Sequence, residues 1–176
     1  MIFIMGALLS CVNSIKEVQK FSESDTLSGM AASNIQYTRS DSGKIQLILK
    51  SPLLLKHEGK KTFTVFPKGF YVQFFDTTGK VISTLKADYG IRKKNAGILE
   101  AKKNVEVKNL KNKETLYTNI LLWNERTKKI IAPGPVKIIG SSRTIYGDSL
   151  IANENFTHRT IYGIRGVLKV KEDSLQ

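Results

Sequence analysis

Leu85-Lys86-Ala87-Asp88-Tyr89 and Leu116-Tyr117-Thr118-Asn119-Ile120 are two copies of one strand pattern, thirty-one positions apart. A weaker third copy begins at residues 145–148, Ile-Tyr-Gly-Asp. An internal period near thirty residues, built from alternating apolar and polar positions, predicts stacked β units that bury their apolar faces against one another. Chance similarity between β-rich segments is the alternative. The same offset superimposes further apolar positions: Leu99 on Ile130, Ala101 on Ala132, Val105 on Val136 and Val107 on Ile138.

Alternation with a period of two extends outward from these repeats, between residues 35 and 170. Turn sequences rich in Gly, Asp, Asn and Pro interrupt it, such as Asp76-Thr77-Thr78-Gly79-Lys80. No stretch longer than about ten residues shows a helical period. We therefore expect an all-β antiparallel domain over residues 34–172, with a tail at 173–176. Because each strand has one apolar face, the strands are expected to form two packed sheets, as an open sandwich or jelly roll.

The chain is strongly basic, with 28 Lys and Arg against 15 Asp and Glu and a formal charge of +13. Such a balance favours an anionic partner: nucleic acid, a membrane surface, or an acidic or phosphorylated ligand. A solvated basic surface is the alternative. The basic residues are scattered between strands, and no stripe of aromatic and basic residues that could stack on bases is visible. We therefore expect no nucleic acid partner.

The N-terminus is apolar and leads to the single cysteine, so no internal disulfide is possible. Leu8-Leu9-Ser10-Cys11 has the order of large and small residues that bacterial lipoprotein signal peptides place at their cleavage point. The apolar run is shorter than the ~20 residues that span a bilayer. We predict a signal segment at residues 1–11, a lipid attached to Cys11 and a tether at residues 12–33. A positively charged start is missing, so an apolar terminus with an incidental thiol is the alternative.

Small residues recur at one repeat position and could leave a groove in the interior. Ala87, Thr118 and Gly147 form one such set, and Ala101 and Ala132 form another. An apolar groove would accept acyl chains, while Lys and Arg at its rim would meet phosphates. A plain packed core is the alternative. The predicted lipid-binding interior comprises Leu47, Phe63, Val65, Val72, Phe74, Leu85, Ala87, Tyr89, Ala101, Leu116, Thr118, Ile120, Ala132, Val136 and Gly147.

Catalytic chemistry finds little support in the sequence. His57 and His158 stand alone beside turns, and no Cys/His cluster, phosphate-binding Gly loop or nucleophile elbow is present. We expect no enzyme activity, no cofactor and no metal.

Residues 66–76, Phe-Pro-Lys-Gly-Phe-Tyr-Val-Gln-Phe-Phe-Asp, and residues 79–89 are the longest of several distinctive segments, and the others are 104–107, 116–118, 122–124, 145–147 and 155–157. Together these segments resemble the LptC family, the periplasmic component of the lipopolysaccharide export machine, in its Bacteroidetes-type branch. The similarity covers roughly residues 35 to 170.

The resemblance implies a twisted β-jelly roll at the periplasmic side of the inner membrane. It implies that lipopolysaccharide arrives from an inner-membrane ABC transporter and passes to a periplasmic bridge protein. The acyl chains would lie in the interior. The transporter permease jelly rolls would dock at the N-terminal edge, and the bridge jelly roll at the C-terminal edge. Much of the family has an N-terminal transmembrane helix, where this chain has Cys11 and therefore a predicted lipid anchor. Ser149 replaces a glycine that is frequent in the family.

Two rival interpretations remain. One is the soluble bridge member of the same superfamily, against which a lipid-bearing Cys11 argues. The other is a periplasmic or surface β-sandwich lipoprotein that binds glycan or protein. It predicts a filled interior and exposed aromatic side chains grouped on an outer face: Tyr71, Phe75, Tyr117 and Trp123.

Overall fold

A computed structural model describes residues 29–59 and 62–168, all of which form strands, turns or loops. The all-β prediction is confirmed. The predicted signal segment, Cys11 and the tail lie outside the described residues, and β1 begins within the predicted tether, at Gly29. The strands are β1 Gly29–Asp41, β2 Lys44–His57, β3 Phe63–Phe66, β4 Phe70–Phe75, β5 Val81–Ala87, β6 Tyr89–Lys93, β7 Ile98–Asn109, β8 Glu114–Asn124, β9 Lys129–Ala132, β10 Val136–Ile139, β11 Arg143–Gly147, β12 Ser149–Asn153, β13 Arg159–Tyr162 and β14 Arg165–Leu168.

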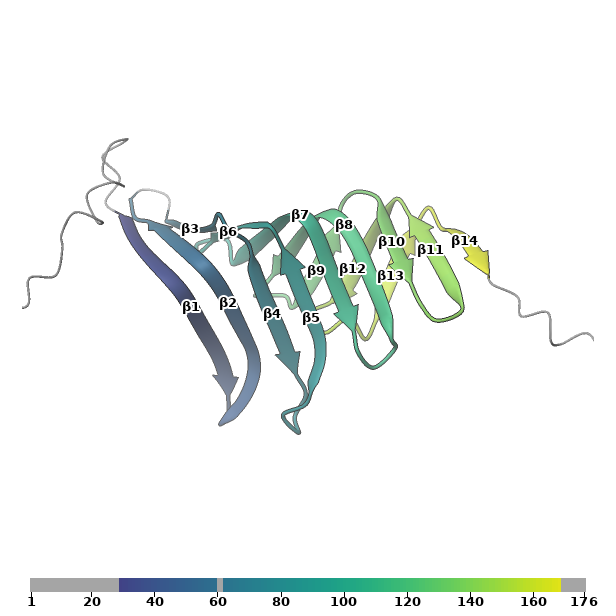
Figure 1. Cartoon of the computed structure of the whole chain (residues 1–176), viewed down its shortest axis with the longest axis horizontal. Coiled ribbons are helices and arrows are strands. Elements are labelled where there is room, and N and C mark those ends of the chain that lie inside the picture. The colour runs from purple at the N-terminus through teal and green to yellow at the C-terminus, as the bar shows by residue number, and fades with distance from the viewer. Residues whose placement is uncertain (1–28, 60–61, 169–176) are drawn as a thin grey trace, which may run out of the picture.

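These strands form one 14-stranded antiparallel sheet that folds over on itself into two layers (Figure 1). The front layer has the order β1-β2-β4-β5-β7-β8-β10-β11-β14. The back layer has the order β2-β3-β6-β7-β8-β9-β12-β13. Three long strands, β2, β7 and β8, belong to both layers because each bends midway. This arrangement is an open jelly roll.

We call the line along which the chain passes between layers the seam, and define it by Asp88, Asn104, Asn119 and Asp148. On β7 the seam is a β-bulge between Lys102 and Val105, where Lys103 and Asn104 have φ values of 64° and 49°. The side chain of Asn104 donates a 2.6 Å hydrogen bond to the carboxylate of Asp88. A bulge adds residues to one strand and bends it, so it allows one strand to serve both sheets.

The inward phase of the alternation changes at the seam. On β8 the buried positions are Leu116 and Thr118 before Asn119, but Leu121 and Trp123 after it. The alternation therefore does not run unbroken through the repeated segments. The consequence is that residues just beyond the seam point away from the interior.

Small side chains at and beside the seam let the two layers approach closely. A Cβ atom on Gly90 would lie 2.6 Å from Phe70 Cε1 and 3.2 Å from Phe66 Cδ2. Ala101 and Ala132 have no exposed surface, and Thr118 bonds to the carbonyl of Pro135 at 3.0 Å. Ala101 and Ala132, two of the small residues at the repeated positions, are thus enclosed by their neighbours. None of the described residues forms a helix that is long and apolar enough to span a bilayer.

Candidate functional site

The interior space of this jelly roll lies between the layers at the N-terminal end of the sheet. A cavity of about 200 Å³ opens there beside β1 and β2. Its walls are mainly apolar, and charged side chains stand at the rim. The lining residues are Ile35, Tyr37, Arg39, Leu47, Leu49, Leu54, Thr64, Phe66, Arg92, Leu99, Trp123 and Glu125.

Trp123 forms the floor of this cavity. It comes from the back half of β8 and is 2 % exposed. Its ring meets Phe74 of the front layer edge-on, at 5.4 Å between centroids, so it packs the two layers together. The Arg39 guanidinium lies 5.7 Å from the centre of the same ring. A buried indole N–H needs an acceptor, and Trp123 Nε1 donates to Glu154 Oε2 at 3.2 Å.

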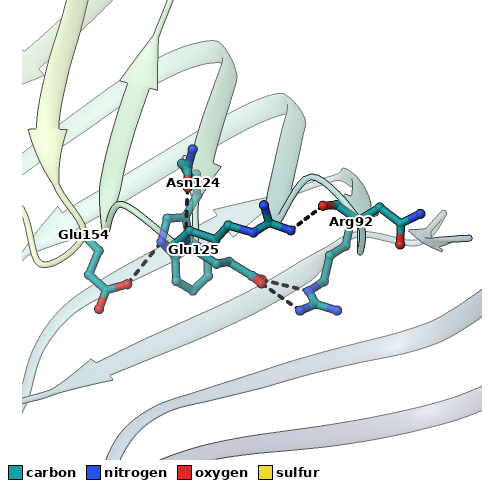
Figure 2. Close-up of polar contacts among 7 residues, drawn as sticks. Arg92, Asn124, Glu125 and Glu154 are labelled. Atoms are coloured by element: carbon teal, nitrogen blue, oxygen red, sulfur yellow. Dashed lines mark hydrogen bonds and ion pairs between the residues drawn. The ribbon is translucent and has the colours of Figure 1, made fainter.

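Arg92 and Glu125 make a charged pair at the rim of the cavity (Figure 2). Arg92 Nε and Nη2 donate to the two carboxylate oxygens of Glu125 at 2.8 and 2.7 Å. Hydrogen bonding to Glu125 raises the pKa of the Arg92 guanidinium, although burial acts in the opposite direction. The two-point geometry of the pair fixes the Arg92 side chain over the cavity.

The side of the jelly roll opposite the seam, which we call the mouth, is crossed by polar contacts. Arg39 of β1 donates to Glu154, which follows β12 in the back layer, at 3.0 Å. Arg159 of β13 pairs with Glu114 of β8 at 2.6 Å. Between these two pairs, the amide of Asn109 donates to the carbonyl of Phe156 at 3.0 Å. These contacts hold the two layers together where no strand is shared.

Elsewhere the interior is tightly packed. Leu85, Leu121, Ile130 and Leu150 have no exposed surface. The cavity is also smaller than the roughly 300–1,000 Å³ of typical ligand pockets. An apolar ligand of any length can therefore enter only if the layers separate at the mouth. The cavity is therefore an apolar slot between the layers, which ion pairs close at the mouth and which Arg39 and Arg92 flank.

Most of the predicted interior residues do point between the layers. They come from both sheets and meet in one continuous core. These residues are Leu47, Val72, Phe74, Leu85, Ala87, Ala101, Leu116, Thr118, Ala132, Val136 and Gly147.

Four residues of the predicted interior lie on the outer face instead, and the expectation that they point inward is wrong. Tyr89 and Ile120 are both in register with Lys102, one position from the inward-facing Ala101, and both are partly exposed. They follow the seam directly, where the phase inverts.

Phe63 and Val65 are the other two corrections. The inward side of β3 is occupied by Thr64 and Phe66, so its alternate residues point outward. Val65 is only 9 % exposed because it is covered on the outer face, in register with Leu55 and Ile91. Phe63 stacks on the ring of His57 at 4.5 Å.

Sequence reasoning missed the polar rim and the floor. Arg39, Arg92, Glu125 and Glu154 carry no local signal, because their partners lie far away in the chain. Trp123, expected on an outer face by the glycan-binding interpretation, is buried. The inward orientation of Trp123 could have been predicted from the sequence, since Leu121 and Trp123 alternate in a new phase after the polar Asn119. Within residues 29–59 and 62–168, no group of three or more His, Cys, Asp or Glu side chains could hold a metal.

A family model described as "Lipopolysaccharide-assembly, LptC-related" matches residues 1–167. No curated protein matches the chain.

Proposed function

The chain belongs to the LptC-related family, and we propose that it takes lipopolysaccharide from an inner-membrane ABC transporter and passes it to a periplasmic bridge protein. The family has a role in lipopolysaccharide transport, is associated with the inner membrane and periplasm, and is not an enzyme family. The handover itself, its direction and its partners are our proposal.

The observation that carries this proposal is the apolar slot between the layers with cations at its rim. Leu49 on the front layer and Leu99 on the back layer face the same cavity. Acyl chains would enter between them and extend along the inward-facing core residues as the mouth opens. Arg39 and Arg92 stand where the phosphates of a lipid headgroup would then lie.

The two ends of the front layer support docking of neighbouring jelly rolls. Among the described residues, β1 pairs only with β2, and β14 pairs only with β11. Each edge strand therefore carries backbone N–H and C=O groups that can pair with a strand of another protein. We propose the transporter permease jelly rolls at β1 and the bridge jelly roll at β14. A lipid on Cys11 would hold the chain at the inner membrane.

Site-specific photocrosslinking in cells tests the lipid path. A probe at Leu121 points into the interior, whereas a probe at Ile120, its neighbour, points outward and is a matched control. We expect a lipopolysaccharide adduct at Leu121 that depends on ATP and the transporter, and none at Ile120. Equal labelling at both positions, or no labelling at any inward position of the folded and exported protein, would reject the interior path.

A further inference from the structure

A row of tyrosines and lysines crosses the outer face of the front layer. Cross-strand pairing aligns Lys50 with Tyr71, Tyr71 with Lys86, Tyr117 with Lys137 and Lys137 with Tyr146. Glu106 of β7 bridges the two halves, in register with both Lys86 and Tyr117. We call Lys50, Tyr71, Lys86, Tyr117, Lys137 and Tyr146 the outer ladder. Each pair of neighbours in the ladder lies on two different strands. The two residues of a pair are distant in sequence unless a hairpin joins their strands.

The three tyrosines remain exposed on strands whose alternate residues face the interior. Tyr71, Tyr117 and Tyr146 are 38 %, 39 % and 40 % exposed. Each presents an apolar ring with a polar tip to solvent. The Lys137 ammonium lies 5.8 Å from the ring centre of Tyr146, so cation and ring share one surface.

The charge of the ladder is positive and largely uncompensated. Lys50, Lys86 and Lys137 are exposed, and no carboxylate among the residues that the structure describes lies within ion-pair distance of them. Glu106 is the acidic member of the row, and Lys108 already pairs with it at 3.1 Å. Hydrogen bonding to Glu106 raises the pKa of Lys108. The row therefore attracts anions.

Two adjoining depressions lie along the ladder, on the seam side. One, of about 570 Å³, is lined by Lys50, Tyr71 and Lys86, and the other, of about 700 Å³, by Lys86, Tyr117, Lys137 and Tyr146. They share Lys86 and Asp88 and so form one long shallow groove. Amide side chains line it as well, among them Asn34 in the first depression and Asn119 in the second.

We propose that this groove binds a linear glycan that carries carboxylates at intervals, on its sugars or on short peptides attached to them, which is the chemistry of cell-wall strands. Pyranose rings pack their C–H faces on exposed aromatic rings, amides bond to hydroxyls, and lysines pair with carboxylates. A groove that crosses many strands suits a polymer better than a small molecule.

Charge spacing favours a glycan over nucleic acid. With strands about 4.8 Å apart, Lys50 and Lys86 are separated by roughly 10 Å, and Lys86 and Lys137 by roughly 14 Å. A nucleic acid strand has a phosphate about every 3.4 Å along a helix and would call for denser cations. A glycan with an acidic group on about every second sugar matches the observed spacing. The association of the family with the periplasm agrees with a cell-wall occupant.

The ladder is also distinct from the proposed lipid path. It lies on the outer face, beside the seam, while the cavity opens between the layers towards the mouth. The saccharide of a lipid held in the cavity would emerge on the opposite side of the molecule. One protein could therefore hold lipid and cell-wall glycan together.

Co-sedimentation of the full chain with purified cell-wall sacculi tests this proposal. We expect binding that weakens with salt, and a loss of about tenfold in affinity for Lys86→Glu combined with Lys137→Glu. Tyr117→Ala should lose about three- to tenfold. Lys129→Glu and Tyr162→Ala, exposed residues of the back layer, are matched controls and should bind as the unaltered chain does.

Several results would overturn the proposal. One is that ladder variants with unchanged thermal unfolding bind sacculi as tightly as the unaltered chain. Another is that Lys129→Glu loses as much affinity for sacculi as the ladder variants do. Stronger competition by single-stranded DNA would assign the groove to nucleic acid. Stronger competition by deacylated lipopolysaccharide would assign it to the transported lipid. Crosslinking at Leu121 in the ladder variants reports the lipid path separately, so failure of one idea leaves the other measurable.

Discussion

Glu154 accepts hydrogen bonds from Arg39 at 3.0 Å and from the indole of Trp123 at 3.2 Å. Arg39 belongs to the front layer, whereas Trp123 and Glu154 belong to the back layer. One carboxylate thus joins the first strand of the sheet, the floor of the cavity and the far side of the mouth. Opening the slot for a lipid requires the Arg39–Glu154 contact to break.

Glu154→Ala should therefore loosen the mouth. It leaves a partly buried guanidinium and an indole N–H without an acceptor, which should lower the free energy of unfolding by about 2 kcal/mol. Chemical denaturation measures this change, and the lipid adduct at Leu121 should increase. Glu58→Ala is the control, because Glu58 pairs with Lys56 at an exposed strand end and its loss should change neither readout. Wild-type stability in Glu154→Ala would show that the contact does not hold the layers.

Acid should weaken the C-terminal half of the mouth through Glu114. The Arg159 guanidinium, paired with Glu114 at 2.6 Å, holds the pKa of this buried carboxyl below its ordinary value of 4.5, with a smaller contribution from Arg143. A group whose pKa is lower in the folded state stabilises the fold above its unfolded pKa, and this stabilisation is lost as the pH falls through the folded pKa. The free energy of unfolding should fall as the pH drops below about 4.5.

Glu114→Gln tests that assignment, since it removes the titrating group. Its stability should depend less on pH in the acid range than that of the unaltered chain. Arg159→Ala should reduce the dependence of the free energy of unfolding on acid pH more than Arg143→Ala does. The reason is that Arg159 lies nearer to Glu114, at 2.6 Å against 3.5 Å for Arg143. Superimposable pH profiles of Glu114→Gln and the unaltered chain would contradict the prediction.

Gly90→Ala should strain the packing between the layers. The added methyl group would meet Phe70 at 2.6 Å and Phe66 at 3.2 Å, so rings of the core must move. Overpacking of this kind costs about 1–3 kcal/mol, measurable as a lower midpoint of thermal unfolding. Gly134→Ala is the control, because a methyl group added there would have no atom within 4 Å. Equal midpoints for the two variants would show that the seam tolerates added volume.

Filling the cavity should hinder lipid uptake without unfolding the domain. Thr64 lines the cavity from β3, and Thr64→Phe places an apolar ring in that space. We expect stability to be kept and the lipid adduct at Leu121 to fall several-fold. Thr115→Phe adds the same ring to the outer face of β8, next to the inward Leu116, and should leave the adduct unchanged. An adduct in Thr64→Phe as strong as in the unaltered chain would show that the lipid does not pass through this cavity.

The all-β class and the repeated strands were predictable from sequence because period-two alternation is a local property. Leu85 and Ala87, like Leu116 and Thr118, stand inward on strands of the front layer, where the alternation runs without interruption. The polar residues Asp88, Asn119 and Asp148 were also visible at equivalent repeat positions. Their role at the seam could not be predicted from the sequence, because a bend between two sheets exists only once both sheets have formed.

The sequence by itself therefore determined the strands, their turns and the repeat that stacks them, since these depend on neighbouring residues. The tertiary structure decided the inward phase beyond the seam, which moved Tyr89 and Ile120 outward and Trp123 inward. It also brought together Arg39 and Glu154, 115 positions apart, and aligned Tyr71 with Lys86 and Tyr117 with Lys137. Cross-strand register and layer packing create such pairs, and no local pattern encodes them.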